Sequence, residues 1–232
     1  MTRAKPIVAI DGPVGAGKST VARALARELG FRYLNTGAMY RAVAIAAHEA
    51  GIDPSAADLE TRLAPILAAI RISFEGERIL LDGADVTDRV ADPAISDLAS
   101  RLSAIGAVRA RMRELQRAAG GEGGVVMEGR DIGTAIFPDA EFKFFLDAEV
   151  AVRARRRYEE LAAKGTSITF EQVLDQLRER DARDSSRALA PLKRADDAIV
   201  VDSTALDIPA VTNAIKEHIL SAANADKGLK RS

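Results

Sequence analysis

Short apolar runs alternate with longer amphipathic segments along most of the chain. Five runs have the length and apolar content of buried strands, and they cover residues 7–10, 31–34, 125–127, 142–146 and 198–201. Segments with apolar residues at helical spacing cover residues 18–29, 38–50, 96–119, 149–163, 169–187 and 208–222. This alternation predicts an α/β fold, in which helices cover both faces of a five-stranded parallel sheet.

The stretch after the second predicted strand breaks this rhythm. Apolar residues alternate with polar ones over 70–74, which is typical of a strand with one buried face, and Gly76 then provides a turn. The stretch therefore predicts a small antiparallel hairpin. Before it, Asp53-Pro54 predicts a helix start with Asp53 as the N-cap. We interpret residues 37–105 as an insert in the core.

The first predicted strand leads into a glycine-rich loop. Gly12 is followed after four residues by Gly17, Lys18 and Ser19, where an amphipathic helix is predicted to begin. This spacing and context are those of a phosphate-binding loop (P-loop), in which backbone N–H groups converge on an anion. Lys18 would reach the β- and γ-phosphates, and the Ser19 hydroxyl would ligate Mg2+. The residues predicted to bind ATP here are Gly12, Pro13, Val14, Gly15, Ala16, Gly17, Lys18, Ser19 and Thr20.

Composition narrows the function classes. The chain has 232 residues and a formal net charge of −1, which implies no global attraction to nucleic acid or membranes. It has no cysteine, so disulfides, thiolate catalysis and zinc–sulfur sites are excluded. No apolar run reaches the length of a membrane span, and we expect no signal peptide before the first strand. We expect a cytoplasmic monomer that acts on small molecules, without nucleic-acid or membrane partners.

Positive charge gathers late in the chain. Residues 153–194 contain 11 Lys or Arg against 7 Asp or Glu, and Arg180, Asp184 and Arg187 share one helix face. One interpretation is a solvated helix with internal ion pairs such as Arg180–Asp184. Because the chain also contains a triphosphate-binding loop, we favour a second interpretation. In it, these arginines close over the transferred phosphoryl group and neutralise its charge.

A second anion site is predicted near residue 36. Thr36 begins a helical segment that carries Tyr40 and Arg41 in its next turn, so a helix N-terminus and an arginine would face one anion. Thr36 would also serve as an ordinary N-cap. Arg109 and Arg113 share another helix face.

Taken together, the motifs resemble those of the bacterial cytidylate kinase family. They are Gly-Pro-Val-Gly-Ala-Gly-Lys-Ser-Thr (12–20), Asn-Thr-Gly-Ala-Met-Tyr-Arg (35–41), Glu-Gly-Arg-Asp-Ile-Gly-Thr (128–134), Phe-Pro-Asp-Ala (137–140) and Glu-Arg-Asp-x-Arg-Asp-x-x-Arg-x-x-x-Pro-Leu (179–192). The chain departs from the family pattern at Val14, often Ser, at Thr36, often Ser, and at Glu128, often Asp. The resemblance extends from residue 6 to about 220.

The resemblance implies one nucleoside monophosphate kinase domain that transfers phosphate from ATP to CMP or dCMP with Mg2+. Its core would cover about 1–36, 106–148 and 196–222, with a monophosphate-binding insert over 37–105, a lid over 149–195 and a flexible tail over 224–232. The implied catalytic residues are Lys18, Arg130, Arg180, Asp184 and Arg187. The further residues implied to bind ATP are Arg156 and Arg157. The implied substrate-binding residues are Thr36, Tyr40, Arg41, Ser100, Arg109, Arg130, Asp131, Arg180 and Asp184, and the implied metal ligand is Ser19.

Three other functions remain open on the sequence alone. A uridylate-, adenylate- or shikimate-type kinase would use the same loop, and a hydroxyl acceptor would require a carboxylate base such as Asp11 or Asp131. A GTP-dependent switch lacks support, because neither Asn-Lys-x-Asp nor Asp-x-x-Gly occurs. RNA binding by the arginine-rich helices is disfavoured, since no aromatic residues alternate with those arginines.

Overall fold

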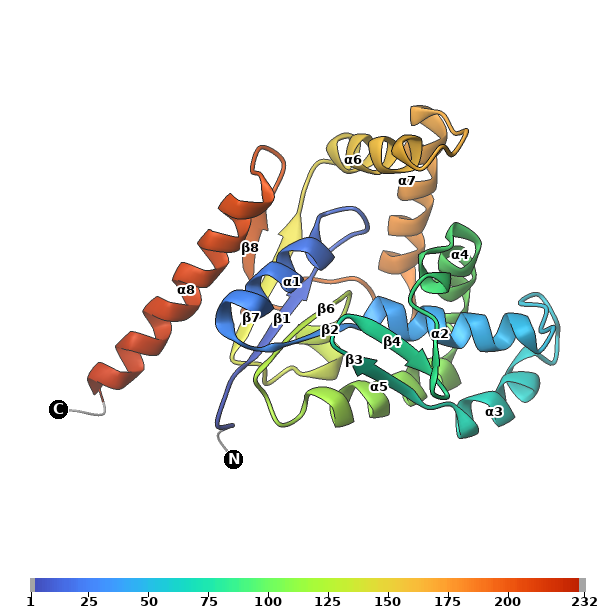
Figure 1. Cartoon of the computed structure of the whole chain (residues 1–232), viewed down its shortest axis with the longest axis horizontal. Coiled ribbons are helices and arrows are strands. Elements are labelled where there is room, and N and C mark those ends of the chain that lie inside the picture. Colours follow the sequence, from blue (N-terminus) through green and yellow to red (C-terminus); the bar gives the residue numbers. More distant parts are fainter. Residues whose placement is uncertain (1–2, 230–232) are drawn as a thin grey trace.

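The computed structural model describes residues 3–229. Its main sheet contains five parallel strands in the order β2-β6-β1-β7-β8 (Figure 1). The strands are β1 (Ile7–Asp11), β2 (Arg32–Asn35), β6 (Val125–Gly129), β7 (Phe142–Asp147) and β8 (Ile199–Asp202). The predicted five-stranded parallel sheet is therefore confirmed, and each strand lies within two residues of its expected position.

Alternation along β1 explains how both faces of the sheet become buried. Val8 and Ile10 pack into the cluster formed with α1 (Lys18–Leu29) and α8 (Ile208–Leu229). Ile7 and Ala9 face the opposite cluster, which a π-helical turn over Ile132–Ile136 completes. Successive strand residues point to opposite faces, so an unbroken apolar strand is expected between two covered faces. Helix α8 continues past its predicted end at residue 222.

The predicted insert forms a small subassembly beside the sheet. It contains α2 (Thr36–Glu49), α3 (Leu59–Ala69), α4 (Pro93–Leu102) and an antiparallel sheet of β3 (Ile72–Glu75), β4 (Arg78–Leu81) and β5 (Ala84–Asp85), with a 3-10 turn over Arg89–Ala91. The hairpin is confirmed, while the two-residue β5 was not predicted. The insert shares one hydrophobic cluster with α5 (Gly106–Gly120). The predicted break near Gly106 separates α4 from α5.

The prediction of a helix start at Asp53 is wrong. Asp53 accepts hydrogen bonds from the backbone N–H and the hydroxyl of Ser55, at 2.8 and 2.7 Å, and so forms a local turn. Helix α3 begins six residues later, at Leu59. Asp-Pro pairs open turns as well as helices, and here the side chain bonds within the turn.

Two helices that pack against each other follow β7. They are α6 (Val150–Ala163) and α7 (Phe170–Ser186), and they pack through a small cluster of Ala154, Leu161, Val173 and Leu177. Thr169 and Gln172 form a capping box that fixes the start of α7. Figure 1 shows this pair beyond the carboxyl ends of the strands, with α7 reaching toward α4.

Candidate functional site

The glycine-rich loop has the curled backbone that its sequence predicts. Gly12, Gly15 and Gly17 have φ values of 149°, 78° and 89°, which side chains rarely allow. A Cβ at Gly12 would also overlap the carbonyl oxygen of Leu146. Gly17 lies directly before α1, so the loop N–H groups and the helix N-terminus form one anion-binding surface. Thr20 is exposed on the first turn of α1.

Lys18 lies inside this loop. Its Nζ donates a hydrogen bond to the carbonyl of Pro13 at 2.6 Å, and its side chain is buried. Burial, together with the nearby Arg130 charge, lowers the pKa of the Lys18 ammonium to about 7. A bound phosphate would place negative charge beside the Lys18 ammonium and stabilise its charged form. The site therefore favours an anion at this position.

Asp11 connects the glycine-rich loop to the segment that follows β6. Its two carboxylate oxygens accept hydrogen bonds from the backbone N–H groups of Ile132 and Gly133, at 2.9 and 2.8 Å. Burial raises the pKa of the Asp11 carboxyl to about 6, although these two hydrogen bonds oppose the rise. The carboxylate thus positions the segment that carries Arg130 and Asp131 next to the glycine-rich loop.

Thr36 has a different local role from the N-cap expected of it. Asn35 caps α2, because its side chain accepts from the N–H of Ala38 at 2.9 Å. The Thr36 hydroxyl instead donates to the carbonyl of Glu128 at 2.6 Å. Thr36 therefore links the ends of β2 and β6, which the sequence alone did not indicate.

A possible metal position lies between Ser19 and Glu128. The hydroxyl of Tyr33 donates to Glu128 Oε1 at 2.7 Å and also contacts the Ser19 side chain. An alcohol oxygen can ligate Mg2+ directly and a carboxylate can orient its bound water, with phosphate oxygens completing the shell. Across residues 3–229 no three His, Asp or Glu side chains gather as a metal cluster. The donor set therefore fits a phosphate-bound Mg2+ better than a metal held by protein alone.

An arginine cluster faces this loop from α7 and from the end of β6. Arg130 Nε pairs with Asp184 at 2.9 Å, and Arg187 lies 3.8 Å from the same carboxylate. Burial alone would raise the pKa of Asp184, but Arg130 and Arg187 outweigh it and hold this pKa below its usual range. The Arg180–Asp184 pair of the disfavoured interpretation, a solvated helix with internal ion pairs, does not form, and Arg180 donates to Ser96 of α4 at 3.0 Å.

Several guanidinium nitrogens in this cluster are buried without a partner among the described residues. They are Nε of Arg41, Nε of Arg180, and Nε and Nη2 of Arg187. Burial lowers the pKa of Arg180 to about 10, with Arg130 adding to the effect, so it remains charged at neutral pH. Buried donors that lack acceptors are costly, and an anion with several oxygens would satisfy them.

A polar cluster suited to a ring edge lies beside these arginines. Arg109 Nη2 pairs with Asp131, both nearly fully buried, and Arg109 Nη1 donates to the carbonyl of Ser103 at 3.2 Å. The hydroxyl of Ser103 donates to the carbonyl of Ser100, whose own buried hydroxyl has no partner among the described residues. Tyr40 lies under the Arg109 guanidinium, 5.8 Å from ring centre to Cζ. The structure thus brings together four predicted residues from α2, α4, α5 and the end of β6.

Arg156 and Arg157 differ in their placement. Arg156 Nη2 donates to the Ser203 carbonyl at 2.6 Å, and the Ser203 hydroxyl donates to the carbonyl of Ala16 at 3.2 Å. Arg156 therefore lies beside the glycine-rich loop. Arg157 pairs with Glu160 at 2.7 Å on the same helix. The positive charge of Arg157 also contributes to lowering the pKa of Arg41.

Sequence reasoning missed several residues that organise the site. They are Tyr33, Ser103, Arg153, Asp181 and Ser203. Asp181 lies inside the 179–192 motif and Arg153 begins the arginine-rich stretch over 153–194, and these were the available signals for the two residues. The others have only the spacing of ordinary helix, strand or loop residues.

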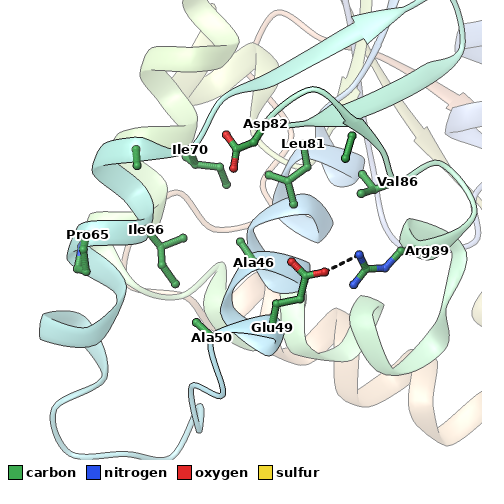
Figure 2. A pocket seen from close by; sticks show the side chains of 12 residues that line it. Ala46, Glu49, Ala50, Pro65, Ile66, Ile70, Leu81, Asp82, Val86 and Arg89 are labelled. Carbon is green, nitrogen blue, oxygen red and sulfur yellow. Dashed lines mark hydrogen bonds and ion pairs between the residues drawn. The ribbon is translucent and has the colours of Figure 1, made fainter.

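The apolar cavity in the insert is not this site. Figure 2 shows it between α2, α3 and the hairpin, with the Glu49–Arg89 ion pair on its wall. Its volume is about 720 Å³, and the ion pair has an N···O distance of 2.6 Å. Its lining contains none of the predicted site residues within the described chain. A smaller hollow of about 190 Å³ does reach the site, because Tyr33 and Arg41 line it.

The fold and the site together define a class of protein. A parallel sheet carries a glycine-rich triphosphate loop after β1, and arginines from four other segments converge opposite that loop. This is the arrangement of a P-loop phosphotransferase with an anionic acceptor. Among the described helices, none has the length and apolarity needed to cross a membrane.

Comparison with known proteins identifies the family within that class. A family model described as cytidylate kinase matches residues 8–221. The chain is 47% identical over 226 residues to a cytidylate kinase of Geobacter sulfurreducens, covering 96% of each chain. It is 49% identical over 212 residues to one of Pelotomaculum thermopropionicum, covering 90% of this chain and 94% of the relative. The chain belongs to the cytidylate kinase family.

Solved structures give a more distant likeness. A shikimate kinase from Acinetobacter baumannii aligns with a TM-score of 0.49 and 17% identity, covering 95% of this chain and 96% of that one.

Proposed function

We propose that this protein is a cytidylate kinase, which transfers the γ-phosphoryl group of ATP to CMP or dCMP and yields ADP and CDP or dCDP. The observation that carries the substrate assignment is the buried Arg109–Asp131 pair together with the Ser100 hydroxyl, which has no hydrogen-bond partner among the described residues. Family membership supports the reaction type.

The base recognition follows from hydrogen-bond complementarity. Asp131 would accept from the exocyclic amine of cytosine, while Arg109 and Ser100 would donate to the ring acceptors. Uracil would present a carbonyl where that amine stands, against the Asp131 carboxylate. An unpaired buried polar group costs about 1–3 kcal/mol, which is enough for clear discrimination.

The chemistry needs no general base. A monophosphate has its second pKa near about 6, so the attacking oxygen is already anionic at neutral pH. The barrier is repulsion between two anions. Arg41 and Arg130 would hold the acceptor phosphate, and Lys18 would hold the γ-phosphate. Arg180 and Arg187 would neutralise the transferred group, with Asp184 orienting Arg130 and Arg187.

Magnesium belongs to this proposal as the cofactor of ATP. Ser19 would ligate it and Glu128 would orient its water shell, because their oxygens share the Tyr33 hydroxyl. When bound, Mg2+ neutralises charge on the β- and γ-phosphates.

We also propose that α6 and α7 act as a lid and that residues 37–105 act as the monophosphate-binding part. Support comes from the contacts of α7 with α4, where Arg180 donates to Ser96 and Arg183 pairs with Asp97 at 3.0 Å. These side-chain contacts join α7 to α4, and a lid that opens would break them.

The protein is proposed to be a cytoplasmic monomer. The glycine-rich loop, the arginine cluster and the Arg109–Asp131 pair are assembled within a single chain, and CMP and ATP are cytoplasmic metabolites. Light scattering on the purified protein would measure the oligomeric state directly.

One assay tests the function against its closest alternatives. ADP production is measured with CMP, dCMP, UMP, AMP, GMP and shikimate as acceptors, each with ATP and Mg2+. The highest kcat/KM is expected for CMP or dCMP. A higher kcat/KM for AMP or shikimate would replace the proposed function with an adenylate- or shikimate-type activity.

A further inference from the structure

Helix α7 contacts the glycine-rich loop through a residue that none of the roles above uses. Asp181 Oδ1 accepts a hydrogen bond from the backbone N–H of Val14 at 3.3 Å, and its Oδ2 pairs with Arg153 at 2.6 Å. Val14 lies 167 positions earlier in the chain, so this contact exists only in the folded protein. One carboxylate therefore joins the loop to both lid helices.

Arg153 of α6 holds the other side of the same peptide segment. Its Nη1 donates to the carbonyl of Val14 at 2.9 Å, and its Nε donates to the carbonyl of Ala148 at 2.8 Å. The Arg153 side chain is only 7% exposed. Because its hydrogen bonds lie in the plane of one guanidinium group, its orientation is well determined.

Apolar contacts also join the glycine-rich loop to the lid helices. Val14 packs against the lid cluster that contains Ala154 and Leu177. A Cβ at Gly15 would lie 3.2 Å from the Cβ of Arg153 and 3.5 Å from Leu177. The loop therefore packs directly on the lid helices. The packing also explains why an apolar residue stands at position 14, because the Val14 side chain contacts the apolar cluster of the lid.

We propose that Asp181 is a positioning residue for ATP: with Arg153 it fixes the Val14 peptide groups from outside the loop and couples the shape of the loop to the lid. This inference rests on the proposed function and extends it. Within the described chain, the side chains of Asp181 and Arg153 form hydrogen bonds only to the loop, to each other and to Ala148. Loss of the Asp181 contacts should therefore weaken the binding of ATP and leave the binding of CMP unchanged.

The test compares Asp181→Asn with the wild-type protein. The amide keeps the shape of the side chain but loses the charge that pairs with Arg153. We expect KM for ATP to rise about tenfold, as for the loss of a charge-assisted hydrogen bond, while KM for CMP stays within about twofold. Asp181→Glu keeps the charge and is expected to recover part of the loss. Asp175→Asn is the matched control, because Asp175 lies on the same helix, is 70% exposed and pairs only weakly with Arg178 at 3.5 Å.

Two further measurements separate positioning from a general loss of structure. Hydrogen exchange at the Val14 amide should accelerate in Asp181→Asn by a larger factor than exchange at the amides of the central strand β1, which reports global unfolding. An equal rise in both KM values, or an unchanged KM for ATP, would overturn the inference.

Calorimetry of ATP binding keeps this test independent of the proposed function. The dissociation constant for ATP is expected to rise in Asp181→Asn by the same factor as KM. A wild-type protein that binds ATP but does not phosphorylate CMP would refute the proposed function and leave the role of Asp181 to be decided by this constant. An unchanged dissociation constant would refute that role whatever the acceptor.

Discussion

The two halves of the site are built in different ways. The donor half is one continuous loop, Gly12–Ser19, that presents backbone N–H groups and a single lysine. The acceptor half uses side chains from α2, α4, α5, α7 and the end of β6. A continuous loop depends on its own backbone conformation, whereas a dispersed set depends on the packing that brings distant elements together.

This difference predicts different responses to substitution. In the donor half, a change of backbone conformation should be severe, and side-chain changes other than at Lys18 and Ser19 should be mild. In the acceptor half, individual side chains should control specificity without affecting ATP. The four predictions below test this contrast, beginning with the largest expected effect.

Removing the donor lysine should have the largest effect. Lys18→Ala is expected to lower kcat by at least about 100-fold, because a preorganised charge at the transferred phosphate is lost. Steady-state kinetics with CMP would measure it, with Lys216→Ala as the control, since Lys216 pairs with Glu28 on the surface. A decrease smaller than about tenfold would contradict the phosphate assignment.

Distorting the donor backbone should come next. Gly12→Ala requires a residue with φ near 149° and places a methyl group against the Leu146 carbonyl. It should cost about 2–4 kcal/mol in the free energy of unfolding and abolish ATP binding. Gly30→Ala is the matched control, because φ is 65° there and no atom lies within 4 Å of the added Cβ. It should cost only about 1 kcal/mol. Equal costs in denaturant unfolding would show that the close approach to β7 does not matter.

Changing the acceptor half should alter specificity. Asp131→Asn is expected to reduce the ratio of kcat/KM for CMP over UMP by about tenfold, since an amide can donate to the uracil carbonyl. KM for ATP should stay unchanged, and exposed Asp139→Asn should leave the ratio unaltered. An unchanged ratio in Asp131→Asn would remove this residue from base recognition.

Asp11, which connects the two halves, should make the free energy of unfolding depend on pH. Burial raises the pKa of Asp11 from 3.8 to about 6, so the folded state binds the proton more tightly than the unfolded chain. The stabilisation this provides is complete below pH 3.8 and is lost as the pH rises to about 6. The unfolding free energy of the wild type relative to Asp11→Asn should therefore fall by about 1 kcal/mol per pH unit in this window.

A second carboxylate checks the sign of this effect. The side chain and backbone of Thr87 lower the pKa of Asp85, so the difference between the wild type and Asp85→Asn should grow with rising pH through that carboxyl's titration. A slope of the same sign for both variants would contradict the assignment of burial as the cause at Asp11.

The elements that the sequence predicted well are those whose signals are local. Helix α1 begins at Lys18 and ends at Leu29, as its apolar spacing and the glycine after it predict. The hairpin over 72–81 follows from strict alternation around Gly76. In each case the residues that carry the signal are neighbours in the chain.

The errors concern competition between local and distant partners. Thr36 is a good N-cap by type, yet Asn35 caps α2 and Thr36 bonds to β6. Arg180 and Asp184 have ideal helical spacing, yet each bonds to a different segment. Local propensity is worth only about 0.2–0.5 kcal/mol for such a pair, so a buried partner from another element prevails.

The amino-acid sequence by itself determined the class of fold, the triphosphate loop and the family resemblance, because these depend on order and spacing along the chain. Only the tertiary structure decided which side chain pairs with which. It joined Asp11 to the segment after β6, Arg109 to Asp131, and Asp181 to the loop at Val14. These contacts span 22 to 167 residues. They form because parallel strands end at one edge of the sheet and because burial makes each charged group require a partner.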